Sequence, residues 1–318
     1  MIATFRRERL APDPRGSVVS VGMFDGVHLG HQAILRANVA RARELGAAPT
    51  VITFRRHPKH LLLGHAPKTL TTLEHRLELF ERAGIEHAAV LHFDASLRAL
   101  SAAEFSREIA ERALAVRCFV LGFDSKFGHD RGGTPESLRT MGYEVEVAPK
   151  VVVQGRPVSS TAIREAVELG DLPAATAMLG RPVSVFGRVV HGANLGHRIG
   201  FPTANLNLHQ ELHPPPGVYA CRVHQLVPGG ARRMLLGVAN IGFRPTVDPT
   251  PPRRPQVEVH VLDFEGDLYG QRIELEFVTR LRGERRFAGV EELAAQITRD
   301  VIEARERLRG APSSNRPG

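Results

Sequence analysis

The sequence predicts an α/β protein with two domains, an N-terminal doubly wound parallel sheet and a C-terminal small antiparallel β-barrel that ends in a helix. In the first half, short apolar runs alternate with stretches of helical periodicity, the pattern of a parallel sheet covered on both faces. After about residue 180 the helical stretches stop, and strands of alternating polarity follow between glycine- and proline-rich turns. We therefore expect domains at 1–180 and 181–310, with 311–318 as a disordered tail.

The composition favours a soluble protein of a reducing compartment. Hydrophobic residues make up 42% of the 318 residues, and no stretch approaches the roughly 20 apolar residues that span a bilayer. The first ten residues are charged and form no apolar leader. Cys118 and Cys221 each lie in an apolar run, so we expect two buried free thiols. The sequence thus predicts a cytoplasmic protein without a membrane partner, as a monomer or weak homo-oligomer.

The formal net charge of +8 raises the question of a nucleic-acid partner. The arginine pairs at 232–233, 253–254 and 285–286 are scattered, and the chain contains no tryptophan and three tyrosines. We therefore expect no nucleic-acid partner. The positive charge suits small anionic ligands, such as nucleotide phosphates, equally well.

Five apolar runs predict the strands of the first domain: 18–21, 50–54, 88–91, 119–121 and 144–147. Four stretches predict the helices between them: 31–45, 73–82, 102–113 and 135–141. Ser101 and Glu104 form a capping-box pattern, and Thr134 precedes a proline at a first helical position. In such a sheet, ligands bind beyond the carboxyl ends of the strands.

The first strand leads into a glycine-rich turn, residues 22–31, and then into a helix start. Gly22 and Gly30 let the backbone bend and lie close to a ligand. His28 and His31 stand at the mouth of the helix, where free N–H groups and the helix dipole favour a phosphate. The turn has neither the G-x-G-x-x-G spacing nor the lysine of a P-loop. Its H-x-G-H pattern resembles the signature of the nucleotidyltransferase superfamily, although histidines at a helix start can also act only as caps.

A second polar element, residues 158–164, precedes a short helix. Ser160 or Thr161 can cap this helix. Hydroxyls followed by Arg164 one turn later can also hold a phosphate at the helix N-terminus, and neither role excludes the other.

Two further loops follow predicted strands and are expected to contact a ligand, residues 53–58 and 121–133. Phe54 and Pro58 can face a flat aromatic ring, with packing in the core as the alternative for Phe54. The second loop is rich in glycine and charge, which argues against a core element.

In the second half, five segments predict the strands of the barrel: 183–190, 217–223, 234–239, 257–263 and 273–278. A final helix over 290–308 has one apolar face and should pack on the barrel. The loop at 192–205 is spaced by Gly196 and Gly200 and ends in Pro-Thr-Ala-Asn. Thr203 and Asn205 offer hard oxygens for Mg²⁺ beside phosphates, with an ordinary turn as the alternative for Asn205.

The strand at 257–261 carries an acidic residue among valines. By alternation, Glu258 and His260 share one face and the three valines share the other. An inward carboxylate in a small barrel would be a general-base candidate, and an outward one would be solvated. We expect the general base.

Taken in order, these motifs closely resemble the bifunctional bacterial riboflavin kinase/FAD synthetase family, over about residues 17–308. The motifs of the first half are 22–31, 53–58, 122–133 and 159–164. Those of the second half are 200–205, 237–246, 257–260, 269–270 and 281–284 with Phe287. Each motif is only moderately specific, and their joint order is highly specific.

The resemblance implies two ATP-dependent reactions, with riboflavin, FMN and ATP as substrates and Mg²⁺ as the cofactor. The barrel would phosphorylate riboflavin to FMN, with Thr203 and Asn205 holding Mg²⁺ and Glu258 accepting the hydroxyl proton. The first domain would adenylylate FMN to FAD, with His28 and His31 stabilising charge on the α-phosphate.

The resemblance also assigns binding roles to further positions. The ATP-binding and phosphate-binding residues of the first domain would be Gly22, Phe24, Asp25, Gly30, Ser160, Thr161 and Arg164. The flavin-binding candidates are Phe54, Pro58, Asp124 and Arg244, the last in a loop over the riboflavin site. Gly196 and Gly200 belong to the ATP loop of the kinase.

Two positions depart from the family pattern. His197 stands where an arginine is expected in the glycine loop, and Ser125 stands where an aromatic residue is common. The competing functions are another H-x-G-H adenylyltransferase, in which the barrel would have no role, and a basic RNA-binding or regulatory protein on a nucleotide-binding fold.

Overall fold

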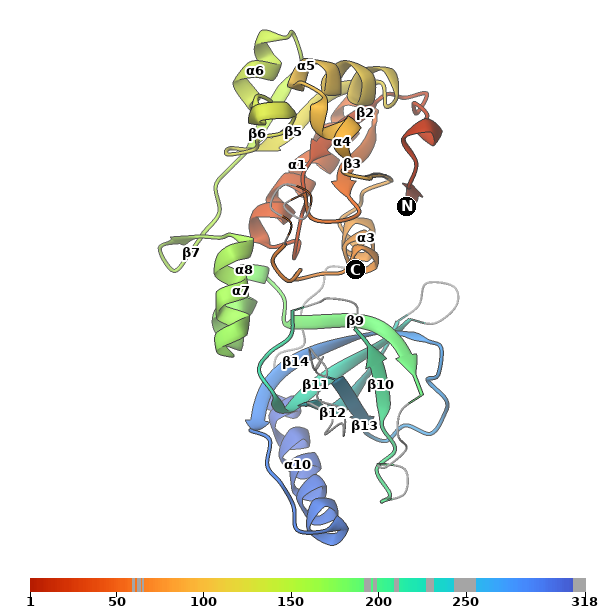
Figure 1. The fold of residues 1–318 in the computed structure, drawn as a ribbon, viewed down its shortest axis with the longest axis vertical. Helices are drawn as coiled ribbons and strands as arrows, with labels where there is room; N and C mark the ends of the chain where they lie inside the picture. Colours follow the sequence, from red (N-terminus) through yellow and green to blue (C-terminus); the bar gives the residue numbers. More distant parts are fainter. Residues whose placement is uncertain are drawn as a thin grey trace. The chain divides into compact units, whose positions relative to one another are not determined.

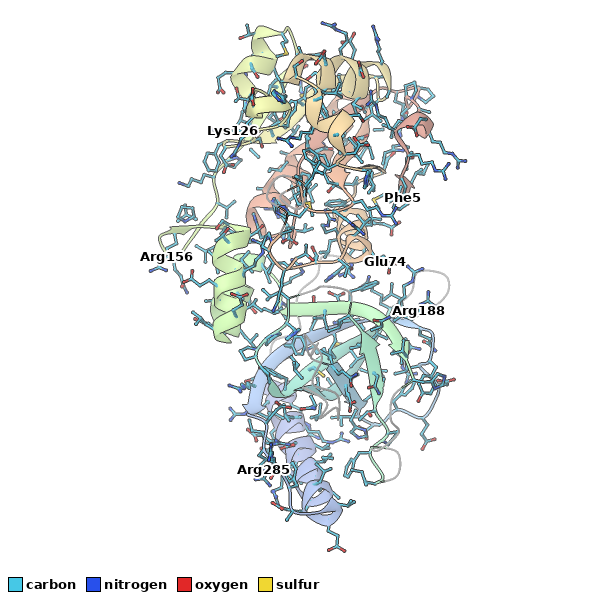
Figure 2. The ribbon with its side chains drawn as sticks, viewed as in Figure 1. Phe5, Glu74, Lys126, Arg156, Arg188 and Arg285 are labelled. Carbon is cyan, nitrogen blue, oxygen red and sulfur yellow. The ribbon has the colours of Figure 1, made fainter. Side chains whose placement is uncertain are left out.

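The computed structural model describes residues 1–58, 61, 64, 66–191, 196, 199–208, 212–226, 232–242 and 256–310. These residues form two compact units, Met1–Ser160 and Thr161–Gly318. Figure 1 shows the elements of each unit, and Figure 2 adds the side chains. Each unit is described by itself below.

The first unit is built on a six-stranded sheet in the order β1-β4-β3-β2-β5-β6 (Figure 1). Its strands are β1 (Ile2–Thr4), β2 (Ser17–Val21), β3 (Ala48–Phe54), β4 (His87–Leu91), β5 (Val116–Gly122) and β6 (Val145–Ala148). Every pairing is parallel. All five residues of β2 are buried, because helices cover both faces of the sheet.

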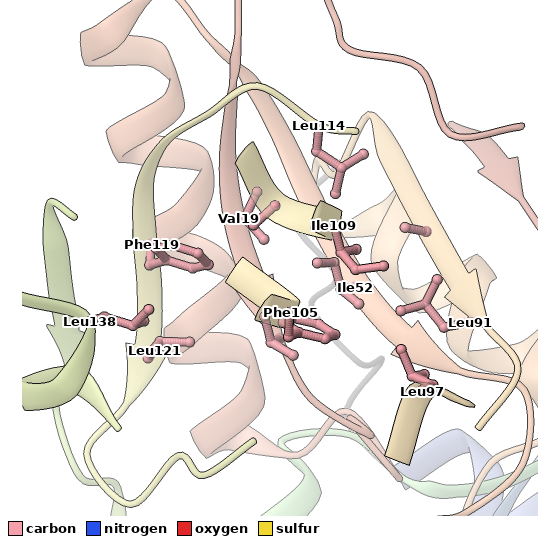
Figure 3. Close-up of a cluster of buried hydrophobic side chains, with 13 residues drawn as sticks. Val19, Ile52, Leu91, Leu97, Phe105, Ile109, Leu114, Phe119, Leu121 and Leu138 are labelled. Carbon is pink, nitrogen blue, oxygen red and sulfur yellow. The ribbon is translucent and has the colours of Figure 1, made fainter. Parts of the chain in front are cut away.

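Two groups of helices cover the two faces of this sheet. One group is α1 (Leu29–Leu45) and α3 (Leu73–Arg82), which contribute Leu35 and Phe80 to clusters with sheet residues such as Val51. The other group is α4 (Ala95–Ala99), α5 (Ala102–Phe105), η2 (Ser106–Arg112) and α6 (Pro135–Thr140). Figure 3 shows the cluster under this second group, where Leu97, Phe105, Ile109 and Leu138 meet Val19, Ile52, Leu91, Phe119 and Leu121.

Local signals set the helix boundaries as expected. The Ser101 side chain accepts from the Glu104 N–H, and the Glu104 carboxylate accepts from the Ser101 N–H, so the capping box is confirmed. Thr134 caps α6 with Ser137 as its reciprocal partner. The expected helix over 102–113 is α5 continued by η2. In η2 the backbone hydrogen bonds join residues five apart in sequence, which is the π-helical pattern. Two short 3₁₀ turns, η1 (Arg7–Arg9) and η3 (His129–Arg131), lie in loops.

Beyond the sheet the chain forms a small hairpin, β7 (Val152–Val153) and β8 (Arg156–Pro157). Gln154 and Gly155 at its tip both have positive φ, as a tight hairpin turn requires. The helices α7 (Ser160–Leu169) and α8 (Leu172–Leu179) follow. Asp171 caps α8, and Gly180 ends it in the left-handed region.

The second unit contains a closed barrel in the order β10-β13-β12-β11-β14-β9 (Figure 1). Its strands are β9 (Val183–Val190), β10 (Ala204–Asn207), β11 (Gly217–Leu226), β12 (Arg232–Gly242), β13 (Gln256–Val261) and β14 (Arg272–Arg282). All pairings are antiparallel. The helix α10 (Val290–Gly310) packs on the outer face, where Ala304 and Leu308 join a cluster with Val218 and Ala220 of β11.

The predicted fold class is confirmed, with additions. The structure adds β1, α4, the hairpin strands β7 and β8, α8 and β10 to the expected elements. Cys118 and Cys221 are both free and buried, as expected. Within the described ranges, no helix has the length and hydropathy needed to cross a bilayer. The expected tail, 311–318, lies outside the described residues.

Candidate active sites

The glycine turn opens at the point where the strand order of the sheet reverses. β3 lies on one side of β2 and β5 lies on the other. The loops that follow β2 and β5 therefore flank this point, which is where open α/β sheets bind ligands. They are residues 22–28 and 123–134, the second marked by Lys126 in Figure 2.

His28 and His31 form a stacked pair at the start of α1. His28 is the N-cap residue, and its Nδ1 accepts a hydrogen bond from the His31 N–H at 3.3 Å. The two imidazole rings are 3.6 Å apart, with an angle of 15° between their planes. Because the His28 Nδ1 is an acceptor, the ring carries its proton on Nε2 when neutral. The first N–H groups of α1 and the helix dipole add to a site suited to an anion.

The backbone that leads to His28 is strained. Phe24, Gly26 and Val27 have φ of 51°, 82° and 39°. A β-branched residue such as Val27 rarely adopts positive φ, and such a conformation costs about 1–3 kcal/mol. Strain of this kind persists only where the surrounding structure imposes it.

Gly22 and Gly30 pack closely against neighbouring rings, and neither has positive φ. A Cβ at Gly22 would lie 3.1 Å from the Phe24 ring, and one at Gly30 would lie 3.2 Å from the His28 ring. Phe24 itself is buried and meets His31 edge-on, with 5.2 Å between the ring centroids. The family glycines thus allow the aromatic packing that orients the histidines.

Asp25 holds the loop together from inside. It is 2% exposed, and its Oδ1 accepts hydrogen bonds from the N–H of Leu70 at 2.9 Å and of Thr71 at 3.2 Å. The Ser160 hydroxyl donates to the Asp25 carbonyl at 2.9 Å. Ser160 is the first residue of α7, so its side chain ties the glycine turn to the end of the first unit.

Sequence reasoning missed Arg76, a buried cation on α3. It is 1% exposed, and its guanidinium donates to the Met23 carbonyl at 2.6 Å, the Thr53 hydroxyl at 3.0 Å and the Phe54 carbonyl at 3.0 Å. Burial lowers the pKa of Arg76 to about 10, and the charge of Asp25 acts in the opposite direction. Arg76 therefore joins the carboxyl ends of β2 and β3. The signal was a basic residue in register with the apolar Leu79 and Phe80 of the same helix.

The flavin candidates of the first unit occupy different environments. Phe54 packs edge-on against Phe93, 5.7 Å between centroids, beside the cluster of Figure 3. Pro58 is half-buried and Asp124 is exposed. Phe123, which sequence reasoning passed over, is 52% exposed, with the Lys150 ammonium 5.5 Å from its ring centroid.

Thr161 and Arg164 lie on the first turns of α7, in the second unit. Thr161 is exposed and Arg164 is half-buried. α7 begins at Ser160, so Ser160 and Thr161 are its first two helical residues and neither occupies the N-cap position that was expected for one of them.

In the barrel, Glu258 lies opposite two asparagines. The register pairs it with Asn205 of β10 and with Asn240 of β12, so the three side chains share one face. Val257 and Val259 are fully buried on the other face, which is the barrel interior. Glu258 thus faces outward, contrary to the inward orientation on which its role as a base was first argued. It is nevertheless half-buried between the neighbouring strands.

Thr203 lines a cavity of about 470 Å³, and its lining includes Val259 and Val261, which lie on the face of β13 opposite to Glu258. Pro202, Val259, Phe264 and Tyr269 also line it. The His260 Nδ1 donates to the Pro202 carbonyl at 2.8 Å and so fixes the segment before Thr203. The volume lies within the range of small-molecule sites.

Two glycines shape the loop that leads to Thr203. A Cβ at Gly196 would clash with the Phe201 carbonyl and lie 3.2 Å from the Thr203 Oγ1, and Gly200 has φ of 83°. Arg244 and His197 lie outside the described residues.

The fold and these two sites define a two-site nucleotide-dependent transferase. The first half of the chain, residues 10–162, matches the FAD synthetase family, and residues 179–308 match the riboflavin kinase family. The chain belongs to the bifunctional riboflavin kinase/FMN adenylyltransferase family.

Curated relatives support this membership over nearly the whole chain. The protein of that name from Pseudomonas fluorescens is 40% identical, covering 96% of this chain and 97% of its own length. The one from Escherichia coli K12 is 38% identical, covering 92% of each chain. A solved structure described as a macrolide-efflux protein from Streptococcus pneumoniae is 31% identical, with a TM-score of 0.82 over 96% of this chain and 99% of that one.

Proposed function

We propose that this chain converts riboflavin to FAD in two ATP-dependent steps. The barrel phosphorylates riboflavin to FMN and releases ADP. The parallel-sheet unit joins FMN to the adenylyl group of ATP and releases pyrophosphate. The observation that carries this proposal is that one chain matches both families, FAD synthetase over residues 10–162 and riboflavin kinase over residues 179–308. Each matched region contains a cluster of polar candidate residues. The alternative adenylyltransferase leaves the match to the riboflavin kinase family without a role.

In the kinase step, Glu258 accepts the proton of the ribityl 5′-hydroxyl. That oxygen attacks the γ-phosphorus, and the bond to the β–γ bridging oxygen breaks, so ADP leaves. Glu258 suits this role because it is half-buried beside Asn205 and Asn240, whose amides can orient it and the hydroxyl. The cavity beside Thr203 receives ATP.

Thr203, which lines this cavity, and Asn205, two residues further along the chain, form a donor set that fits Mg²⁺. Thr203 supplies a hydroxyl and Asn205 an amide oxygen, while ATP brings phosphate oxygens, and hard oxygen ligands of this kind are those that Mg²⁺ prefers. When bound, the ion would neutralise phosphate charge. Gly196 and Gly200 let the loop backbone approach these phosphates.

In the adenylyl step, a phosphate oxygen of FMN attacks the α-phosphorus of ATP, and the bond to pyrophosphate breaks. His28 and His31 donate hydrogen bonds to the α-phosphate oxygens as their charge grows. Gly22, Phe24, Asp25 and Gly30 shape the loop that presents these rings. The chain needs no covalent intermediate, because the nucleophile belongs to FMN.

Further residues complete this site. Ser160, Thr161 and Arg164 hold the β- and γ-phosphates that leave as pyrophosphate. Phe54, Pro58 and Asp124 contact the flavin of FMN, and Arg244 belongs to the riboflavin site of the barrel. We place the protein in the cytoplasm, supported by its two free buried thiols, as a monomer or weak homo-oligomer without a nucleic-acid partner.

Two substitutions separate the two reactions. The protein is incubated with riboflavin or FMN and Mg-ATP, and the flavins are resolved by chromatography. Glu258→Gln should lower FMN formation by about 10²–10⁴-fold and leave conversion of FMN to FAD intact. His31→Ala should do the reverse, so that FMN accumulates.

Matched controls are Glu306→Gln on the exposed side of α10 and His92→Ala at an exposed position after β4, which should change neither reaction. If both Glu258→Gln and His31→Ala lose both activities while folded, the assignment of two independent sites is wrong. A wild-type protein that makes neither FMN nor FAD, yet binds RNA tightly at physiological salt, would favour the regulatory alternative.

A further inference from the structure

Thr71 is a buried threonine in the segment just before α3, and no motif of the sequence singled it out. It is 2% exposed. Its Oγ1 accepts a hydrogen bond from the Gly26 N–H at 3.0 Å and lies 3.4 Å from the Asp25 Oδ1. Its own N–H donates to that same carboxylate oxygen at 3.2 Å. One side chain thus contacts two consecutive residues of the glycine turn.

These contacts fall at the strained part of the turn. Gly26 and Val27 are both in the left-handed region, and His28 follows directly. On the other side of Val27, its carbonyl accepts from the Gln32 side chain at 2.9 Å. The strained residue is therefore held between a bond to Thr71 before it and a bond to α1 after it. Without the first bond, Val27 can relax toward negative φ, which turns the backbone that carries His28.

We propose that Thr71 is a positioning residue for adenylyl transfer, which acts by holding the Asp25–Val27 turn in the strained form that aims His28 at the α-phosphate. Thr71 is enclosed by protein and does not touch substrate. Its effect therefore falls on the geometry of the stacked His28–His31 pair. A displacement of about 1 Å at such a pair can lower a rate by on the order of 10²-fold.

The neighbouring Thr72 provides a matched control. Its Oγ1 caps α3 by accepting from the His75 N–H at 3.2 Å. Thr71→Val and Thr72→Val make the same change, a hydroxyl replaced by a methyl group, at adjacent positions. If the loss of a hydroxyl acted only through stability, both variants would lose activity.

The experiment measures kcat and KM for conversion of FMN to FAD, and kcat for riboflavin phosphorylation, in the full chain. Thr71→Val should lower kcat of adenylyl transfer at least tenfold with KM for ATP within about twofold, because a misdirected histidine loses transition-state contacts first. Kinase activity should be unchanged. Thr71→Ser, which keeps the hydroxyl, should restore kcat to within about twofold. Thr72→Val should lower the thermal midpoint and keep both activities.

The proposal fails if Thr71→Val keeps kcat within twofold of wild type, if Thr72→Val loses as much, or if Thr71→Ser is as inactive as Thr71→Val. Where Thr71→Val does not fold, as judged by circular dichroism, Thr71→Cys tests the same bond with a weaker acceptor and should give an intermediate kcat. The inference rests on the proposed adenylyl transfer. A wild-type chain that forms no FAD refutes that function, whereas active wild type with active Thr71→Val refutes only the role of Thr71.

Discussion

Replacing Arg76 by methionine tests whether a buried cation stabilises the ends of β2 and β3. Methionine keeps most of the apolar stem and removes the guanidinium, which donates to the Met23 carbonyl, the Thr53 hydroxyl and the Phe54 carbonyl. Two opposing effects follow. The three acceptors lose a charged donor, and the chain no longer buries a cation.

The structure gives the size of each effect. Hydrogen bonds from a charged group contribute about 1.5–3 kcal/mol each, so three contribute about 5–9 kcal/mol. Burial lowers the pKa of Arg76 to about 10. At about 1.4 kcal/mol per pKa unit, the corresponding desolvation penalty is about 3 kcal/mol, which the substitution removes. We expect Arg76→Met to lower the free energy of unfolding by about 2–6 kcal/mol.

Equilibrium unfolding in urea, followed by far-ultraviolet circular dichroism, measures this change. Arg76→Lys keeps the charge with fewer bonds and should show a smaller loss. Arg43→Met, on the exposed side of α1, is the matched control and should stay within about 0.5 kcal/mol. A loss below about 1 kcal/mol, or a gain in stability, would show that relief of desolvation outweighs the hydrogen bonds and would refute this reasoning.

Three further predictions concern stability and reactivity. Burial raises the pKa of both the Cys118 and the Cys221 thiols, so neither should react with iodoacetamide until the chain unfolds, as mass spectrometry can show. Hydrogen bonds from the Ser101 side chain and N–H lower the pKa of Glu104, so its stabilising effect is present at neutral pH and lost as the pH falls below about 4.3. Glu104→Gln should therefore flatten the acid limb of a melting-temperature profile, and an unchanged limb would contradict this. Asp300→Asn breaks the two-pronged contact with Arg282 on a buried carboxylate and should lower the unfolding free energy by about 2–4 kcal/mol, measured by denaturation.

The sequence predicts most of the sheet because its strands are buried on both faces. Continuous apolar runs such as 18–21 and 50–54 read as strands on composition alone, and both are confirmed as β2 and β3. The short edge strand β1 was not predicted, because Ile2 is 62% exposed and the segment shows no pattern of burial. β10 was not predicted as a strand, because its four residues lie in a stretch that resembles a ligand-binding loop.

The face of a barrel strand is harder to predict than its periodicity. Alternation in β13 correctly separates Glu258 from the valines. Which face is interior depends on tertiary packing, in which Val257 and Val259 lie opposite Ile241 and Ala239 of the neighbouring strand β12. Period-two alternation contains no such information. Arg76 is a similar case, because a lone arginine on an amphipathic helix reads as solvated until the topology places it under two strand ends.

The stacked histidines determine which hydrogen-bond donors the first site can offer to a phosphate. The two rings are stacked, with 3.6 Å between their centroids. The Nδ1 of His28 already accepts an amide N–H, and protonating it would break that cap. When His28 is neutral, its ring proton therefore lies on Nε2. Under the proposed adenylyl transfer, the strained turn orients this donor, so we expect the rate to depend on the geometry of residues 22–28.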